Sequence, residues 1–240
     1  MNNAITPIGE SPANPMLRLE KLEKSVHAGS NRLWLLRQID LSIGPGEFVA
    51  VTGPSGAGKS TLLSILGLMD SEFAGRYFLD GKPVHELNAK QRQTLQRDSI
   101  GFIFQNYHLL DDLSVAENLE LPLSYRNVPT AERKARVAEI LDRFQIVGKK
   151  DLYPRQLSGG QQQLVAVARA TITRPKLLLA DEPTGALHSS QGELIMNLLA
   201  ELNREGASII MVTHNPENAR RAGRQISLLD GWMEQSLAAV

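Results

Sequence analysis

Residues 47–69 read EFVAVTGPSGAGKSTLLSILGLM and contain three local patterns in succession. EFVAVT is a short apolar run that predicts a buried strand, and TLLSILGLM has the apolar spacing of a helix. Between them, residues 53–60 match the pattern G-x-x-x-x-G-K-[ST]. A strand, a glycine-rich loop and a helix in this order are the setting in which that pattern binds phosphate. The stretch therefore predicts a phosphate-binding loop in an α/β fold.

The chemistry of this loop follows from its residue types. Glycines permit a tight turn whose backbone N–H groups point inward at the α- and β-phosphates of a nucleotide. Lys59 can reach the β- and γ-phosphates, and the hydroxyl of Ser60 can bind Mg²⁺. An ordinary glycine turn is the alternative, and the complete motif between a strand and a helix argues against it. The predicted nucleotide-binding residues are Gly53, Pro54, Ser55, Gly56, Ala57, Gly58, Lys59, Ser60 and Thr61.

A second strand ends in two carboxylates. Residues 177–188 read LLLADEPTGALH, an apolar run followed by Asp181 and Glu182. An aspartate at the end of a buried strand can face the Mg²⁺ of a phosphate loop, usually through water. Glu182 then lies where it can polarise the water that attacks the γ-phosphate. The alternative is a strand end whose acid caps a helix, and the phosphate loop upstream makes it the weaker interpretation.

Composition bounds the class of protein. The 240 residues are 42% hydrophobic and 22% charged, which is typical of a globular chain. Lys plus Arg and Asp plus Glu both number 26, so no net charge favours nucleic acid or an anionic membrane surface. The absence of cysteine excludes disulfides and thiolate metal sites. No apolar run approaches the roughly 18 to 20 residues that span a bilayer, and residues 1–16 read as a disordered tail rather than a secretory signal.

Strands and helices alternate along the rest of the chain. Residues 115–147 have helical periodicity and form a candidate helical insert. Alternation of apolar strands with helices predicts a mostly parallel sheet covered on both faces, which is an α/β fold class. Further strands are predicted in MLRLEKLEKSV and LWLLRQIDLSI around the turn HAGSN, in SIGFIF, KLLLAD, SIIMVT and QISLLDG, and in GRYFLDGKPV as a hairpin turning at Asp80-Gly81.

A third segment, LSGGQ at residues 157–161, opens a predicted helix with a serine and two glycines. Such a start leaves free N–H groups at the positive end of the helix dipole. It is a second phosphate-binding device in a chain that already has one, although a lone pentapeptide of this kind could be a capped helix start. The predicted residues are Ser158, Gly159, Gly160 and Gln161.

Together, the phosphate loop, LSGGQ and the DEPT strand resemble the motifs of ATP-binding cassette (ABC) ATPases, from about Leu17 onward. The resemblance implies one nucleotide-binding domain at residues 17–240. Its P-loop NTPase (RecA-like) core would carry an antiparallel β subdomain and an α-helical subdomain at about residues 106–160. In this family the signature of one subunit covers the ATP on the phosphate loop of another. That implies a head-to-tail dimer of two copies around two ATP molecules with Mg²⁺.

The resemblance assigns two further residues. Gln105 in GFIFQNYHLL matches the Q-loop glutamine, which touches Mg²⁺ and the attacking water and senses the membrane partner. His214 in MVTHNPE matches the switch histidine that contacts the γ-phosphate. The implied catalytic residues are Glu182, His214 and Gln105, and the implied metal residues are Ser60, Gln105 and Asp181.

Within the family, GFIFQNYHLLDDLSVAENLELPL and QLSGGQQQLVAVARA are similar to the branch of the macrolide exporter MacB, the lipoprotein-release ATPase LolD and the division protein FtsE. This implies an ATPase, peripheral at the cytoplasmic face of the inner membrane, that drives a separate FtsX- or MacB-like permease for export or mechanical work. A periplasmic adaptor would be reached through the permease, and no nucleic acid is expected. The alternative is an FtsE-like regulator of envelope or division machinery that moves no substrate. A cassette protein of DNA repair or translation is disfavoured, because those usually carry two cassettes or zinc modules.

Three residues depart from the usual pattern of this branch. Val26 in SVHAG replaces the aromatic residue that stacks on adenine, Leu164 follows QQQ where arginine is usual, and His188 replaces the aspartate of GALD. All three are expected near the nucleotide. We therefore expect weak adenine selectivity and slow hydrolysis, with Glu182 still the activating base and His188 a modifier of turnover.

Overall fold

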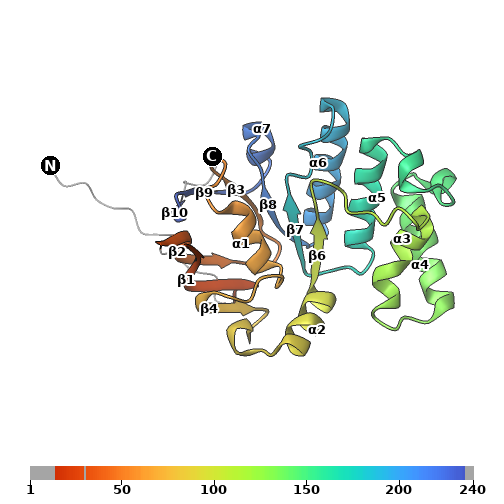
Figure 1. Cartoon of the computed structure of the whole chain (residues 1–240). Helices are drawn as coiled ribbons and strands as arrows, with labels where there is room; N and C mark the ends of the chain where they lie inside the picture. Colours follow the sequence, from red (N-terminus) through yellow and green to blue (C-terminus); the bar gives the residue numbers. More distant parts are fainter. Residues whose placement is uncertain (1–13, 30, 236–240) are drawn as a thin grey trace.

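The computed structural model describes residues 14–29 and 31–235, and its strands form two sheets (Figure 1). The predicted tail at residues 1–16 lies outside this range except for its last three residues, of which Met16 is buried. The larger sheet has the order β10-β9-β3-β8-β7-β6, with only β10 antiparallel to its neighbour. Its strands are β3 (Phe48–Thr52), β6 (Ile100–Ile103), β7 (Leu177–Asp181), β8 (Ser208–Val212), β9 (Arg224–Leu229) and β10 (Trp232–Gln235).

The smaller sheet is antiparallel, with the order β2-β1-β4-β5. It follows from the hairpin signals near the start of the chain, including the turn at Asp80-Gly81, where both residues have positive φ. The first hairpin is tighter than predicted, because its strands continue through most of HAGSN and leave only residues 29–30 between them. The strands are β1 (Leu17–Ala28), β2 (Asn31–Ile43), β4 (Ala74–Leu79) and β5 (Lys82–Pro83).

The larger sheet lies between two hydrophobic cores. Along β7, Leu177 and Leu179 pack in one core with α1 and the smaller sheet, while Leu178 and Ala180 pack in the other with α3 to α6. This period of two is what a strand buried on both faces requires. The predicted α/β fold with an antiparallel β part and a helical part is therefore confirmed. The helices are α1 (Lys59–Leu66), α2 (Ala89–Ser99), α3 (Val115–Ser124), α4 (Thr130–Arg143), α5 (Gly159–Thr171), α6 (Ser189–Arg204) and α7 (Pro216–Ala219).

Helix α2 was not predicted from apolar spacing. Its sequence is AKQRQTLQRDS, in which only Leu95 and Ser99 are buried, so it carries almost no hydrophobic stripe. Its start is instead marked by a capping box in which the side chains of Asn88 and Gln91 each bond the other residue's backbone N–H. The predicted helical insert is resolved into α3 and α4, which pack on each other, and α3 also packs on α5.

Four parallel strands end at the same edge of the larger sheet. The phosphate loop follows β3, Gln105 follows β6, Asp181 ends β7 and His214 follows β8. The carboxyl ends of neighbouring parallel strands form the usual ligand-binding edge of an open α/β sheet. This topology therefore gathers residues that are more than 150 positions apart in the sequence, from Gly53 to His214.

Candidate nucleotide-binding and hydrolysis site

The phosphate loop is held from behind by close backbone contacts. Gly53 has a φ of 141°, and a Cβ there would lie 2.1 Å from the carbonyl oxygen of Leu228. Gly58 has a φ of 101°, and its Cβ would lie 2.4 Å from the carbonyl oxygen of Leu35. No side chain larger than hydrogen fits at either position. Gly56 also has a positive φ of 79°, but among the described residues no atom beyond its chain neighbours lies within 4 Å of the point that a Cβ would occupy there. The loop is therefore packed against backbone at Gly53 and Gly58 and open at Gly56.

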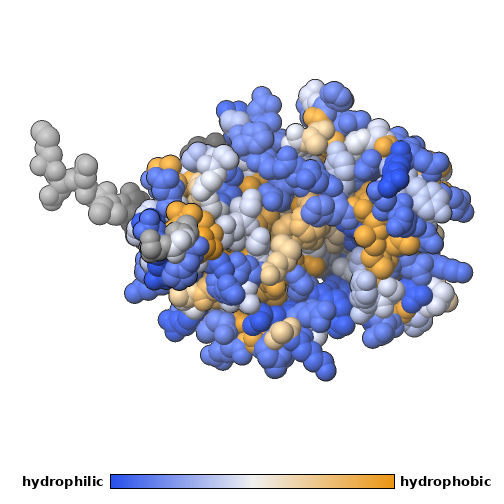
Figure 2. Space-filling view, in the orientation of Figure 1, coloured by the Kyte–Doolittle hydropathy of each residue, from blue (hydrophilic) through white to orange (hydrophobic). Residues whose placement is uncertain are grey.

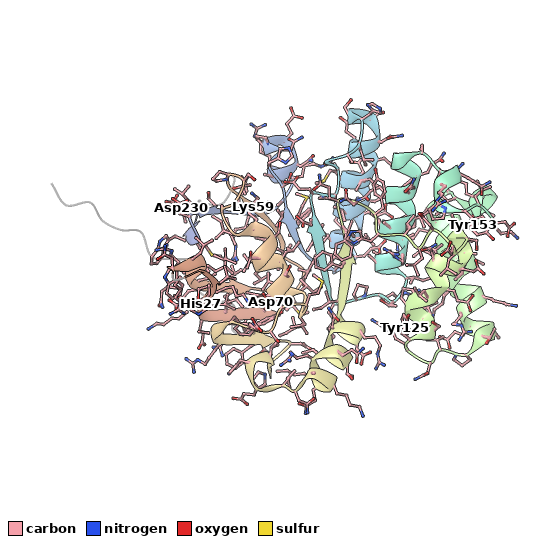
Figure 3. All side chains as sticks on the ribbon, viewed as in Figure 1. His27, Lys59, Asp70, Tyr125, Tyr153 and Asp230 are labelled. Carbon is pink, nitrogen blue, oxygen red and sulfur yellow. The ribbon has the colours of Figure 1, made fainter. Side chains whose placement is uncertain are left out.

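Lys59 lies across its own loop. Its Nζ donates hydrogen bonds to the carbonyl oxygens of Gly53 and Pro54, both at 2.8 Å. Helix α1 begins at this residue, and its N-cap is Gly58, which has no side chain to cap the first turn. The turn therefore presents backbone N–H groups and one ammonium at the positive end of the helix, which is an anion-binding arrangement. Figure 3 shows Lys59 at the start of α1 and Tyr125 on the helical side of the molecule.

Asp181 faces the phosphate loop from the end of β7. Burial raises the pKa of its carboxyl group, the neighbouring Glu182 raises it further, and Lys59 acts in the opposite direction. A bound cation would offset the first two effects. The hydroxyl of Ser60, the carboxylate of Asp181 and the amide oxygen of Gln105 are hard oxygen donors, the kind that Mg²⁺ prefers. The donor set at this edge therefore fits a magnesium ion.

Glu182 and His214 are in direct contact. The Glu182 carboxylate accepts a hydrogen bond at Oε1 from the backbone N–H of His214 at 2.9 Å, and His214 Nδ1 lies 2.8 Å from the same oxygen. Glu182 has a φ of 46°, which turns its side chain out of the strand direction, and its own N–H donates to the carbonyl of Val212 at 3.0 Å. Sequence reasoning gave these two residues separate roles and missed the pair. Their positions after adjacent parallel strands, β7 and β8, were the available signal.

Gln105 and Glu182 both lie close to Gly185. A Cβ on Gly185 would lie 3.1 Å from Gln105 Nε2 and 3.4 Å from Glu182 Cβ, so the absence of a side chain there lets the amide approach. The three residues predicted to be catalytic therefore lie together at the edge of the sheet. Asp181 and Lys59 lie at the same edge, close enough for their charges to interact.

The LSGGQ segment starts α5, as predicted, but on the other side of the sheet from α1. Figure 1 shows β7 and β6 between the two helices. Ser158 is the N-cap: its Oγ accepts from the N–H of Gln161 at 3.4 Å, and its own N–H donates to Gln161 Oε1 at 3.1 Å. The structure therefore does not bring Ser158, Gly159, Gly160 and Gln161 to the phosphate loop of the same chain.

A buried glutamine on α5 was missed by sequence reasoning. Gln163 is 1% exposed, and its Nε2 donates to the carbonyl oxygen of Pro183 at 2.8 Å. This bond ties α5 to the residue that follows Glu182. A polar residue on the apolar face that also holds Val167 was the signal that could have found it, since buried amides need partners.

The three departures from the branch pattern occupy different environments. Val26 is 38% exposed on β1 and pairs with Leu33 of β2, which is 53% exposed. Leu164 is half-buried against the core that contains the helices. His188 lies at the N-cap position of α6 and makes no side-chain capping bond. The imidazole of His188 therefore does not cap α6.

A phosphate loop between β3 and α1, with Asp181 and Glu182 at the end of a nearby parallel strand, defines a P-loop nucleoside triphosphatase. The sequence model of the family described as "ABC transporter" matches residues 36–185, which run from within β2 through Gly185. The chain therefore belongs to the ABC transporter family as an ATP-binding cassette with ATPase activity, as the resemblance predicted.

Curated relatives agree with this assignment. The macrolide export ATP-binding/permease protein MacB of Brucella melitensis is 46% identical over 217 residues, covering 90% of this chain and 34% of that protein. The pyoverdine export ATP-binding/permease protein PvdT of Pseudomonas syringae pv. tomato is 47% identical over 218 residues, covering 90% and 33%. The chain thus spans about a third of the length of these relatives.

A solved structure agrees as well. The dimeric structure of a post-hydrolysis state of the ATP-binding cassette MJ0796 bound to ADP and Pi superposes with a TM-score of 0.85. It is 39% identical and covers 92% of this chain and 98% of that one. The cassette described here is therefore related in sequence to the ATP-binding part of MacB-type export proteins and in structure to a dimeric cassette. Among residues 14–29 and 31–235, no helix has both the length and the apolar character needed to cross a bilayer.

Proposed function

We propose that this chain binds and hydrolyses ATP to drive a membrane permease of the FtsX or MacB type, at the cytoplasmic face of the inner membrane. The observation that supports the proposal is the separation, by strands of one sheet, of the two helix starts predicted to bind phosphate, α1 and α5. One nucleotide cannot contact both starts within a single chain. Two copies arranged head to tail would bring the α5 start of each to the nucleotide on the α1 start of the other.

The chemistry assigned to the first copy is positioning followed by proton transfer. Residues 53–61 hold the phosphates, and Lys59 exchanges its bonds to Gly53 and Pro54 for the β- and γ-phosphates. Ser60, Gln105 and Asp181 would hold Mg²⁺, which neutralises charge on the phosphates when bound. Glu182 accepts the proton of the attacking water.

His214 has to change partner in this scheme. In the structure its ring and its backbone N–H both bond the Glu182 carboxylate, which leaves less of that carboxylate free for water. Transfer of the imidazole to the γ-phosphate would release one of these bonds. The Glu182 to His214 contact is thus a resting arrangement, and the nucleotide converts it into the active one.

A groove of about 600 Å³ between α2, β6, α3 and α5 is the proposed docking site for a permease helix. Figure 2 shows hydrophobic residues gathered around the hollow near the centre of that face. Tyr125 and Met69 at the groove are 64% and 48% exposed, and Leu110, in the segment that leads into α3, is 47% exposed. Arg169, which also lines the groove, donates hydrogen bonds to the carbonyls of Tyr107 and His108, so a docked helix would lie against the side chain that holds the segment following Gln105.

The test uses Glu182→Gln. This change should lower the ATPase rate by about 100-fold or more, since it removes a general base. With MgATP, light scattering should show the 26.4 kDa chain becoming a dimer of twice that mass.

A second experiment tests the permease contact. Co-purification with a candidate permease should be reduced by Tyr125→Glu. A monomer at saturating MgATP would contradict the proposal, and permease binding without movement of any substrate would identify a regulator of envelope machinery instead.

A further inference from the structure

The hydroxyl of Tyr107 lies at the first residue of α5. A Cβ added to Gly159 would be 2.8 Å from Tyr107 Oη and 3.8 Å from Cζ, and no other described atom outside the helix and its chain neighbours lies within 4 Å of it. Tyr107 belongs to the segment after β6, two residues beyond Gln105. One aromatic side chain therefore connects the Gln105 segment to the start of the LSGGQ helix.

Tyr107 is held in place by a half-buried cation. Arg169, ten residues into α5 from Gly159, donates from its guanidinium to the carbonyl of Tyr107 at 2.9 Å and to the carbonyl of His108 at 2.7 Å. Partial burial lowers the pKa of this guanidinium. The two hydrogen bonds to carbonyl oxygens offset the free-energy cost of removing the charge from water. The same helix is thus contacted near both ends by consecutive parts of one loop.

The backbone of this loop is in an uncommon conformation. Tyr107 and His108 have φ of 60° and 49°, so two successive non-glycine residues occupy the left-handed region. Each such residue costs free energy and persists only where its surroundings impose it. The Phe104 and His108 rings also lie 4.4 Å apart, and the side chain of the fully buried Asn118 bonds both the N–H and the carbonyl of Leu110. The loop is therefore constrained on both sides of Tyr107.

From this geometry we propose that Tyr107 is a positioning residue for ATP hydrolysis, which braces the first turn of α5 from the Gln105 segment while Arg169 holds the brace in place. The inference rests on the proposed function in one respect, namely that the α5 start completes the nucleotide site of a second copy. It implies that a displacement of the Gln105 segment is transmitted to the LSGGQ turn through a rigid ring.

The test is a double-mutant cycle on the whole 240-residue chain. Gly159 has no positive φ, so an alanine there should favour the helix unless the tyrosine hydroxyl obstructs it. In the native background, Gly159→Ala should therefore lower the unfolding midpoint. In the Tyr107→Phe background, the same change should raise it. Gly160→Ala is the matched control, because its Cβ would meet Gln191 of α6 at 2.4 Å. Tyr107→Phe should not rescue that variant.

Kinetics separate positioning from mere packing. Tyr107→Phe should lower kcat by about fivefold with KM for ATP unchanged, because small displacements of a positioned group reduce rate while the phosphate loop is untouched. Gly159→Ala should lower kcat further, with partial recovery in the double variant. The inference would be overturned if Gly159→Ala changed the unfolding midpoint in the same direction in both backgrounds. An unchanged kcat in Tyr107→Phe would overturn it as well. A Glu182→Gln chain that stays monomeric with MgATP would instead contradict the proposed function, while the stability cycle would still test the brace.

Discussion

Helices α1 and α5 both begin at sequences proposed to bind phosphate, yet their first turns are built differently. At α1 the N-cap is Gly58 in a left-handed conformation, a residue without a side chain that could bond the first-turn N–H groups. At α5 the N-cap is Ser158, which exchanges reciprocal side-chain bonds with Gln161. The first start therefore leaves its N–H groups without a bond from a capping side chain, whereas at the second start Ser158 accepts from the N–H of Gln161 and can still donate its hydroxyl proton to a phosphate. The bond from Gln161 N–H to Ser158 is long, at 3.4 Å. We expect α1 to bind nucleotide first and α5 to follow from a second copy.

Lys59→Met tests the α1 start, and it should have the largest effect on ATP binding and hydrolysis. The ammonium would be lost from bonds to phosphate, and charge-assisted bonds contribute about 1.5 to 3 kcal/mol each, so ATP affinity should fall by about 10- to 100-fold or more. Hydrolysis should fall to background. Calorimetric titration with MgATP measures the affinity. Lys134→Met, at an exposed position on α4, is the control that should bind as the native chain does. Equal affinity in the Lys59 variant would contradict the assignment of the loop.

Ser158→Ala tests the α5 start and should leave the α1 start unaffected. Loss of the cap should lower the free energy of unfolding by about 1 kcal/mol. ATP binding to the monomer should be unchanged, while MgATP-driven dimerisation in the Glu182→Gln background should need several-fold more nucleotide. Ser114→Ala is a matched control, since Ser114 and Glu117 form the same capping box at α3. The control should lose similar stability and dimerise normally. If the two serine variants dimerised alike, α5 would have no special role.

Asp181→Asn should sharpen the comparison by testing the charge that faces α1. The carboxyl pKa is raised in the folded chain by burial and by Glu182, with Lys59 opposing them, so the ionised form disfavours folding. This unfavourable contribution is complete above the folded-state pKa and vanishes below the unfolded value of about 3.9. Without Mg²⁺, the asparagine variant should be more stable than the native chain at pH 7, with the advantage lost on acidification. Denaturant unfolding in a chelator between about pH 3.5 and pH 8 measures this. An advantage that grows toward low pH would reverse the sign and contradict the argument.

The sequence predicted the two helix starts and the parallel sheet because each depends on local signals. Glycine and serine residues indicate the loops. Apolar residues that alternate with polar ones, or that follow one another without interruption, indicate the strands of the sheet. It did not predict α2, whose residues are too polar to show periodicity. Nor did it predict the contact of Glu182 with His214, the bond from Gln163 to Pro183, or the approach of Tyr107 to Gly159. The first two had weak signals, namely the positions of Glu182 and His214 after adjacent strands and a glutamine on an apolar helix face. The approach of Tyr107 depends on how a loop meets a helix in three dimensions, which spacing along the chain does not encode.

Val26→Tyr should produce the smallest effect, and only at α1. Val26 and its register partner Leu33 are both exposed aliphatic residues on the first hairpin, and the carbonyl of Leu35, two residues further along β2, lies against Gly58 of the phosphate loop. An aromatic ring on this face could stack on adenine and contribute about 0.5 to 1.5 kcal/mol by analogy with aromatic pairs, so ATP should bind about 2- to 12-fold tighter.

The same ring should leave the affinity for inorganic tripolyphosphate unchanged, because that ligand has no base to stack. His27→Tyr is the matched control: successive side chains of a strand point to opposite faces, so its ring would lie on the other face of the hairpin and should not alter either affinity. Dimerisation through α5 should be unaffected once the phosphate loop is saturated. Comparable ATP affinity in Val26→Tyr and the native chain would show that the aliphatic pair of Val26 and Leu33 already holds the base as well as a ring does.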